Sequence, residues 1–378
     1  MAWLGTWAKR VKLTIDNTDI DGVLSDFPIL LYLSTSSGRN SEDISFIFDE
    51  LTQDANRKKI AVTTSDGETE CYVEIEKWDD ANEKAWLWVK VPSVASDADT
   101  DLYLYYDSSH ADNDAYVGDP SDAVVHNVWD SNFKLVCHMR DDPDTSHVRD
   151  STVNANDGTK KGANEPVVTT SGKISDAQEF DGSNDYITMA EIASLRLYNT
   201  DYTVEAWLKC DDYGPVTNWD CMVLVKREYE VAGYVLSIRG AKDGTNAGKM
   251  FIQHNYSGVN VAGAANSVIG TAAFRHCAWR YDLSDTQMHF ELDGADDGDI
   301  NLAANDENTA DAISTGAEGG NHQFDGKIDE LRVSTIFRTG AWIKASYETG
   351  RDNLLDWGSE EEAEAPTGFP HSIGVIIG

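Results

Sequence analysis

The stretch Phe324-Asp325-Gly326-Lys327-Ile328-Asp329-Glu330-Leu331-Arg332-Val333 decides how this chain folds. Apolar residues at Ile328, Leu331 and Val333, an Asp-Gly turn before them and the absence of proline predict a β-strand. The Asp-Glu pair in its middle is unusual, because burying two carboxylates is costly unless something pairs them. We expect the compensation to come from a bound hard cation or from a ring of backbone N–H groups.

A second acidic segment, Asp150-Ser-Thr-Val-Asn154-Ala-Asn156-Asp157-Gly158, lies far upstream. We expect the two segments to pin together the first and last parts of one domain. Carboxylate and amide oxygens suit Ca²⁺, which takes six to eight oxygen ligands in proteins. The predicted structural calcium site uses Asp150, Asn154, Asp157 and Asp329. The alternative is that Asp150 and Asn154 cap turns through side-chain-to-backbone hydrogen bonds.

The remaining sequence predicts an all-β protein with two antiparallel sandwich, or jelly-roll, domains and an extended C-terminal tail. Of 378 residues, 41% are hydrophobic and 10% aromatic, enough for well-packed cores. Turn residues recur about every ten residues between short apolar runs, which is typical of all-β folds. The predicted parts are a β-domain over 1–115, a connector over 116–132, a larger sandwich over 133–352, and an acidic linker with an apolar tail over 353–378.

Residues 1–115 resemble the DUF2341 domain, a family without an established function. The resemblance rests on Asp26-Phe27-Pro28, Trp86-Leu-Trp88-Val-Lys-Val-Pro92 and Leu102-Tyr-Leu-Tyr-Tyr106, in that order. Residues 133–350 resemble the LamG-like, concanavalin A-like jelly roll of the LamG_3 type. Its marks include Phe180-Asp-Gly-Ser-Asn-Asp-Tyr-Ile187 and the stretch that opens this section. This second resemblance supports the calcium prediction, since LamG-like domains often hold Ca²⁺ at a sandwich rim.

Two aromatic ladders in the first domain present Trp86, Trp88, Tyr103 and Tyr105 at alternate positions. If these residues share one side, they form a surface that docks against a neighbouring domain or chain, or a platform for sugar rings. The alternative is that both faces are covered within the domain.

The C-terminal segment changes character. Gly358-Ser-Glu-Glu-Glu-Ala-Glu-Ala-Pro366 reads as an acidic linker. Apolar residues follow it, and we expect them to add a strand to the sheet edge of a neighbouring subunit, with folding back onto their own domain as the alternative. The residues of this predicted assembly tail are Phe369, Ile373, Val375, Ile376 and Ile377.

Composition excludes several classes of function. A net charge of −36 opposes binding to nucleic acid through phosphate contacts. No stretch is apolar enough to insert into a membrane, and the first residues do not form a secretory signal. The five cysteines show no C-x-x-C pairing, so buried free thiols are expected, with a Cys210–Cys221 bridge left open.

Catalytic patterns are weak. Glycoside hydrolysis needs two carboxylates about 5 to 9 Å apart across a cleft. Glu205, Glu291 and Glu330 are conceivable, but the Glu-x-Asp-x-x-Glu motif of jelly-roll glycanases does not occur. No Gly-x-Ser-x-Gly is present, and His138, His276 and His289 are expected to be bonded within strands. No catalytic residue is therefore predicted.

We predict a non-enzymatic structural or recognition protein of a virus particle, decorating the capsid or associated with the tail. The missing secretion signal, the apolar C-terminus and the surface-recognition modules favour this interpretation. The expected partners are neighbouring virion subunits, further copies of the chain and host surface glycans. The alternatives are a secreted or cell-surface carbohydrate-binding adhesin and a glycan-active enzyme. The predicted location is the virion surface, or the extracellular space or cell surface under the adhesin hypothesis.

Overall fold

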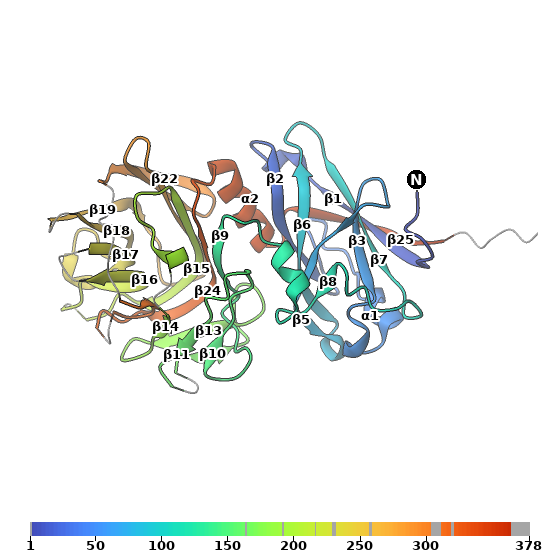
Figure 1. The fold of residues 1–378 in the computed structure, drawn as a ribbon, viewed down its shortest axis with the longest axis horizontal. Helices are drawn as coiled ribbons and strands as arrows, with labels where there is room; N and C mark the ends of the chain where they lie inside the picture. The colour runs from blue at the N-terminus through green and yellow to red at the C-terminus, as the bar shows by residue number, and fades with distance from the viewer. Residues whose placement is uncertain are drawn as a thin grey trace, which may run out of the picture.

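The protein is nearly all β and consists of two sandwiches side by side, as Figure 1 shows. The computed structural model describes residues 2–162, 165–190, 193–215, 217–228, 232–256, 259–303, 311–318 and 321–363. No helix in these ranges is long and apolar enough to cross a membrane. All five cysteines are buried free thiols.

The N-terminal sandwich has two sheets that enclose one apolar core. The four-stranded sheet has the order β2 (Leu24–Leu33), β6 (Lys84–Val94), β5 (Val73–Asp79) and β8 (Val117–Gly118). The five-stranded sheet has the order β25 (Leu355–Glu362), β1 (Lys9–Ile15), β7 (Thr100–Tyr106), β3 (Ile60–Thr64) and β4 (Glu70–Cys71). The short helix α1 (Phe46–Leu51) packs at its side.

Strand β25 corrects the prediction that an acidic linker begins at residue 353. It pairs antiparallel with β1, from Ile15 opposite Leu355 to Lys9 opposite Glu362. In Figure 1 it is the red strand among the blue ones. Its glutamates suit an edge strand, since charged side chains there discourage pairing with other chains. The second sandwich is therefore an insertion into the first, which the end of the described chain completes.

The second sandwich packs two eight-stranded sheets around one core. The first sheet has the order β10 (His147–Val148), β11 (Gly158–Lys160), β14 (Ile187–Met189), β23 (Ile313–Thr315), β16 (Asp220–Glu228), β17 (Ala232–Arg239), β18 (Lys249–Tyr256) and β19 (Val259–Val268). The other has the order β12 (Val167–Thr169), β13 (Ala177–Asp181), β24 (Asp325–Ser334), β15 (Tyr202–Asp212), β20 (Arg275–Asp282), β21 (Gln287–Leu292) and β22 (Ala295–Asn301), with β9 (Phe133–Cys137) also paired to β24.

The acidic stretch 324–333 forms most of strand β24, and this strand carries a β-bulge. Trp207 pairs with Asp329 and Glu205 pairs with Arg332, so two residues of β24 lie opposite Ala206 alone. Glu330 takes a φ of 51°, in the left-handed region that such irregularities use. Ile328, Leu331 and Val333 therefore all face the core. The Asp-Glu pair and Arg332 lie on the other face.

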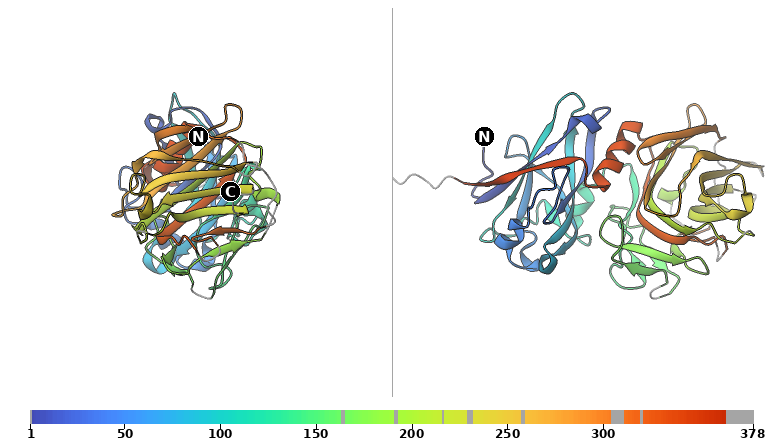
Figure 2. Two further views of the ribbon diagram at one scale, coloured as in Figure 1. Left: turned by 90° about the vertical axis from the view of Figure 1, so that its left-hand side faces the viewer. Right: turned by 180° about the vertical axis from the view of Figure 1, so that it is seen from behind.

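Helix α2 (Gly340–Gly350) lies between the two sandwiches, as Figure 2 shows from behind. Its N-cap Thr339 accepts a hydrogen bond from the backbone N–H of Trp342. The Trp342 ring packs edge-on against Phe27 of β2, with 4.8 Å between ring centroids. Residues of α2 and of both sandwiches join one continuous buried cluster. The interface is thus an apolar core that fixes one sandwich against the other.

Candidate functional site

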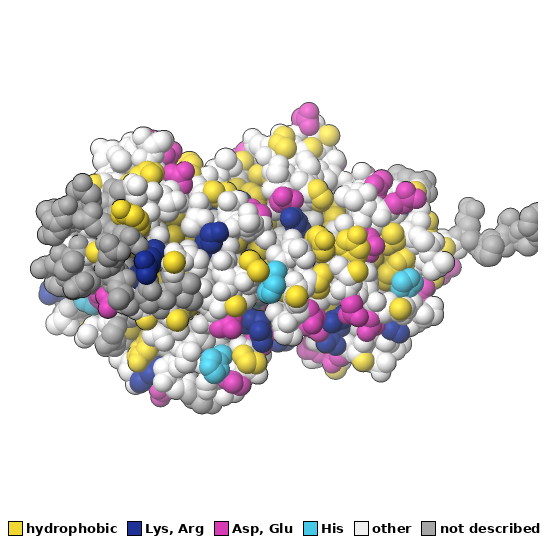
Figure 3. All heavy atoms as spheres, viewed as in Figure 1, with side chains coloured by type: hydrophobic (Ala, Val, Ile, Leu, Met, Phe, Trp, Pro, Cys, Tyr) yellow, Lys and Arg dark blue, Asp and Glu magenta, His cyan; other side chains and the backbone are white. Residues whose placement is uncertain are grey.

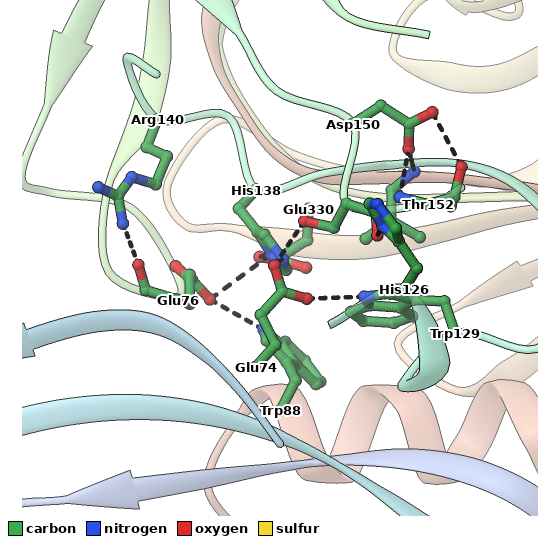
Figure 4. Close-up of polar contacts among 12 residues, drawn as sticks. Glu74, Glu76, Trp88, His126, Trp129, His138, Arg140, Asp150, Thr152 and Glu330 are labelled. Atoms are coloured by element: carbon green, nitrogen blue, oxygen red, sulfur yellow. Dashed lines mark hydrogen bonds and ion pairs between the residues drawn. The ribbon is translucent and has the colours of Figure 1, made fainter. Parts of the chain in front are cut away.

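Charged residues are buried where the sandwiches meet. Glu74 and Glu76 extend from β5, His138 follows β9, and Glu330 and Arg332 extend from β24. The carboxylates and the imidazole are at most 3% exposed. Figure 4 shows them converging, with the indole rings of Trp88 and Trp129 beside them.

Hydrogen bonds occupy most of the polar atoms of this cluster. The Nδ1 of His138 lies 2.7 Å from Glu330 Oε1, and Arg332 donates to Glu330 Oε2 at 2.6 Å. The Trp88 indole donates to Glu76 at 2.9 Å, and the Trp129 indole donates to Glu74 at 2.7 Å. The two sandwiches meet in this network, because Ser151 donates to Glu74 at 2.6 Å and His138 Nε2 lies 3.4 Å from Glu74 Oε1.

Charge compensation explains how the cluster is tolerated. Burial alone would lower the pKa of His138, but the carboxylates of Glu330, Glu74 and Glu76 raise it well above its ordinary value. Burial would raise the pKa of Glu330, yet His138 and Arg332 hold it below the ordinary value. Burial raises the pKa of Glu76 despite the nearby His138. These shifts favour an imidazolium at His138 beside an ionised Glu330, whereas burial favours the protonated form of Glu76.

The same cluster contains a group with the geometry of metal ligands. Glu76, His138 and Glu330 each offer one ligand atom, and these atoms lie within 4.8 Å of one another. Both oxygens of Glu330 are already bonded, to His138 and to Arg332. A metal ion would have to displace the imidazole proton and sit beside a guanidinium. The residues therefore fit a buried ion-pair network better than a metal centre.

The structure does not bring the four predicted calcium ligands together. Asp150 accepts hydrogen bonds from the backbone N–H groups of Val136, Thr152 and Asn156. Asp157 accepts from the N–H of Asp150 at 2.9 Å. These carboxylates shape the loop and hold it to β9, which is the turn-capping alternative.

The other two predicted ligands have separate roles. The amide of Asn154 donates to the carbonyl of Phe133 at 3.2 Å. Asp329 lies on strand β24 and faces a different loop, where its Oδ2 accepts from the N–H groups of Lys173 and Ile174 at 2.7 and 2.8 Å. For Asp329, backbone N–H groups compensate one oxygen, while Oδ1 is buried without a partner and burial raises the pKa of this carboxyl group well above its ordinary value.

The four predicted aromatic residues do not share one exposed surface, because they lie on different sheets. Trp86 and Trp88 are on β6, where Trp88 is 1% exposed and packs against His138 and Arg332 of the second sandwich. Tyr103 and Tyr105 are on β7, buried under Trp3, Trp7 and the guanidinium of Arg10. Trp88 therefore docks a neighbouring domain, and the two tyrosines are covered within their own.

The carboxylates considered for glycoside hydrolysis are also engaged. Glu205 lies 3.5 Å from His276 Nε2, and Glu291 pairs with Arg280. Glu330 belongs to the interface cluster. All three are nearly fully buried, so none presents a free carboxyl group to a substrate.

A cavity of about 640 Å³ lies beside α2, against the outer face of the sheet that contains β24. Its aromatic wall combines Trp207 of β15, Phe274 before β20 and Tyr347 of α2. The rings of Trp207 and Tyr347 stack with 5.6 Å between centroids. Exposed residues at the rim, including Ala272 and Ala273, open the cavity to solvent.

Sequence reasoning missed this cavity. Its aromatic residues come from two strands and a helix that are far apart in the chain. A partial signal was available, because Trp207 and Lys209 alternate with core residues on one predicted strand, and the terminal helix containing Tyr347 was expected.

Comparisons with solved structures find general likenesses over little more than half of this chain. The binding domain of Paraclostridial Mosquitocidal Protein 1 is 11% identical with a TM-score of 0.45, over 58% of this chain and 52% of that one. The botulinum neurotoxin serotype G binding domain is 10% identical with a TM-score of 0.44, over 57% and 50%. This chain thus spans about half the length of these two domains.

A shorter structure is covered almost completely. Domain 4 of AbnA, a GH43 extracellular arabinanase from Geobacillus stearothermophilus, in complex with arabinotriose, is 21% identical with a TM-score of 0.43, over 57% of this chain and 98% of that one. No curated protein matches the sequence.

Family comparisons confirm both resemblances seen in the sequence. Residues 56–130 match DUF2341, a domain of unknown function. Residues 181–344 match Laminin_G_3, the concanavalin A-like lectin/glucanases superfamily. The chain therefore carries a DUF2341 region followed by a concanavalin A-like region of the Laminin_G_3 type.

Proposed function

We propose that this chain is a non-enzymatic carbohydrate-recognition protein that binds a saccharide in the cavity of Trp207, Phe274 and Tyr347. The carrying observation is the aromatic wall of a cavity of about 640 Å³, a volume typical of small-ligand sites. Aromatic faces pack against the C–H faces of sugar rings, while polar groups around them fix orientation. The match to a superfamily that contains lectins supports the proposal.

The non-enzymatic part of the proposal rests on the carboxylates. Among the described residues, Asp293 is the one carboxylate that lines the cavity, and it accepts a hydrogen bond from Arg275 at 2.6 Å. Hydrolysis of a glycosidic bond normally needs a pair of carboxyl groups, about 5 to 9.5 Å apart. A cavity with aromatic walls and one engaged carboxylate suits binding.

A glycan array tests the proposal, with the Tyr347→Ala and Phe274→Ala variants beside the wild type. We expect the wild type to bind a defined set of glycans and both variants to lose that binding while they remain folded by circular dichroism, with a lower Tm because both side chains pack against the core. The matched control is Tyr198→Ala, which removes a 44% exposed tyrosine of the same sandwich outside the cavity. An array without hits, or binding that both variants retain, would reject the proposal.

The virus particle is the setting that we propose for this recognition. Support comes from the combination of two sandwich regions, one of them lectin-like. The predicted assembly tail, Phe369 to Ile377, lies outside the described residues. Banding particles of the producing culture on a density gradient tests this setting. A fixed ratio of this chain to a capsid or tail protein supports it, and recovery with cell envelopes or free in the medium favours the adhesin alternative.

A further inference from the structure

The charges around the cavity are opposite in sign to those of the whole chain. Lys173, Lys209, Lys327 and Arg351 line it, while the chain has a net charge of −36. The carboxylate among the lining residues, Asp293, is occupied on both oxygens by Arg275 and by the backbone N–H of His276. The lining therefore has a local excess of positive charge.

Lys173 contributes most to this excess. Each of the other three cations has a carboxylate partner. Lys209 pairs with Asp211. The Nζ of Lys327 lies 3.9 Å from Glu179 Oε2, and the Nη1 of Arg351 lies 3.6 Å from Glu348 Oε1. No described carboxylate lies within 4 Å of the Lys173 ammonium, which stands 5.0 Å from the centroid of the Trp207 ring. Burial lowers the pKa of Lys173, and repulsion from Arg351 adds to this effect. Asp329, Asp352 and Asp293 attract this cation but offset only part of the effect. A half-buried cation without a carboxylate in direct contact is costly, and a bound anion would reduce that cost.

We propose that the cavity takes an acidic saccharide, with a sugar ring against the aromatic wall and its carboxylate or sulfate facing Lys173 and Arg351. This inference rests on the proposed function and narrows its ligand class. Charge-assisted hydrogen bonds to carboxylate or sulfate are stronger than those to neutral hydroxyls. The acidity of the whole chain does not prevent binding, because charges farther than about 8 Å are largely screened at physiological salt. Figure 3 shows basic side chains interspersed among acidic ones on one face of the molecule.

Isothermal titration with matched probes tests the inference. The probes are tetragalacturonate, its fully methyl-esterified form of equal length, and a sulfated tetrasaccharide derived from heparin. We expect at least one acidic probe to bind at least tenfold more tightly than the neutral ester, and raising the salt concentration to weaken the acidic probe alone. The two acidic probes distinguish a carboxylate from a sulfate as the recognised group.

Variants assign the preference to the cavity. Lys173→Gln should weaken the acidic probe about tenfold and leave binding of the neutral ester within about twofold, while Lys173→Arg should keep the preference. Lys249→Gln on β18, which belongs to the other sheet and does not line the cavity, is the matched control and should behave like the wild type. Equal binding of neutral and acidic probes, lost in Tyr347→Ala, would overturn the inference and leave the proposed function standing. A preference that Lys173→Gln does not alter would also overturn it, and glycan-array hits restricted to neutral sugars would do the same. Failure of every probe together with an empty array would reject both proposals.

Discussion

Replacing Glu330 by glutamine should destabilise the whole protein, because this carboxylate neutralises two buried cations. It receives hydrogen bonds from His138 at 2.7 Å and from Arg332 at 2.6 and 3.2 Å. Glutamine has nearly the same shape but no charge. In the Glu330→Gln variant the imidazolium keeps Glu74 at 3.4 Å. The guanidinium keeps its stacking on Trp88 and Trp129 and its attraction to Glu205 on the neighbouring strand.

The expected loss follows from these contacts. Removing one partner of a buried ion pair costs about 3–5 kcal/mol, since an uncompensated charge stays buried. The amide oxygen still accepts one hydrogen bond, so we expect about 3 kcal/mol, at the lower end of that range. The matched control is Glu179→Gln, whose carboxylate is 46% exposed and lies 3.9 Å from Lys327. Exposed pairs of this kind contribute about 0–1 kcal/mol.

Urea unfolding followed by tryptophan fluorescence measures both variants, with free energies from linear extrapolation. Trp88 and Trp129 report on the interface directly, since both indoles donate to its carboxylates. The double variant Glu330→Gln/Arg332→Met should lose less than the sum of the single variants, because it removes a cation together with its partner. A Glu330→Gln protein within 1 kcal/mol of the wild type would refute this account of the interface.

Three further predictions concern the same framework. In the folded protein the pKa of Glu76 is raised by burial, so the folded state keeps a proton that the unfolded state loses above about pH 4.3. The free energy of unfolding should therefore fall as the pH rises above that value, and Glu76→Gln should flatten this fall in urea titrations at several pH values; an unchanged slope contradicts it. Thr349→Val removes the hydroxyl that accepts the buried N–H of Leu30 at 2.9 Å and should cost about 1–3 kcal/mol, whereas Thr349→Ser should cost less; equal losses would count against the hydrogen bond. Because Asp150 is occupied by N–H groups, EDTA should leave the Tm unchanged, and a rise in Tm with added Ca²⁺ would restore the predicted calcium site.

Local patterns in the sequence were sufficient to predict the fold class. Alternating residues such as Val204, Ala206 and Leu208 mark a strand whose one face is buried, and the structure has them in β15, facing the core. The last strand was missed because its pattern is not typical of a strand. Leu355 and Trp357 alternate inward, but Gly358 and three glutamates follow. The pairing with β1 depends on a contact between the two ends of the described chain, which no local pattern reveals.

The site could be predicted only in part, for a related reason. The Asp-Glu pair of β24 indicated a demand for compensation, and backbone N–H groups meet part of it at Asp329 through one of its two oxygens. The bulge at Glu330 is invisible in the alternation of residues, yet it turns both acidic side chains to the same face. Glu74 and Glu76 of the other sandwich lie beside His138, and this contact, like the walls of the cavity, depends on how distant elements dock.

The insertion of one sandwich into the other has a mechanical consequence. Lys9 lies opposite Glu362 at one end of the β1–β25 ladder, and the N–H of Ala363 donates to the carbonyl of Ala8 at 2.8 Å. A pulling force applied at residues 8 and 363 therefore loads this end of the ladder first and must open its pairs one after another. Until the ladder has opened, the segment between residues 16 and 354 carries no tension, because the force passes between the two pulled residues through the β1–β25 hydrogen bonds. The lectin-like sandwich and its cavity would keep their shape while the molecule is under load.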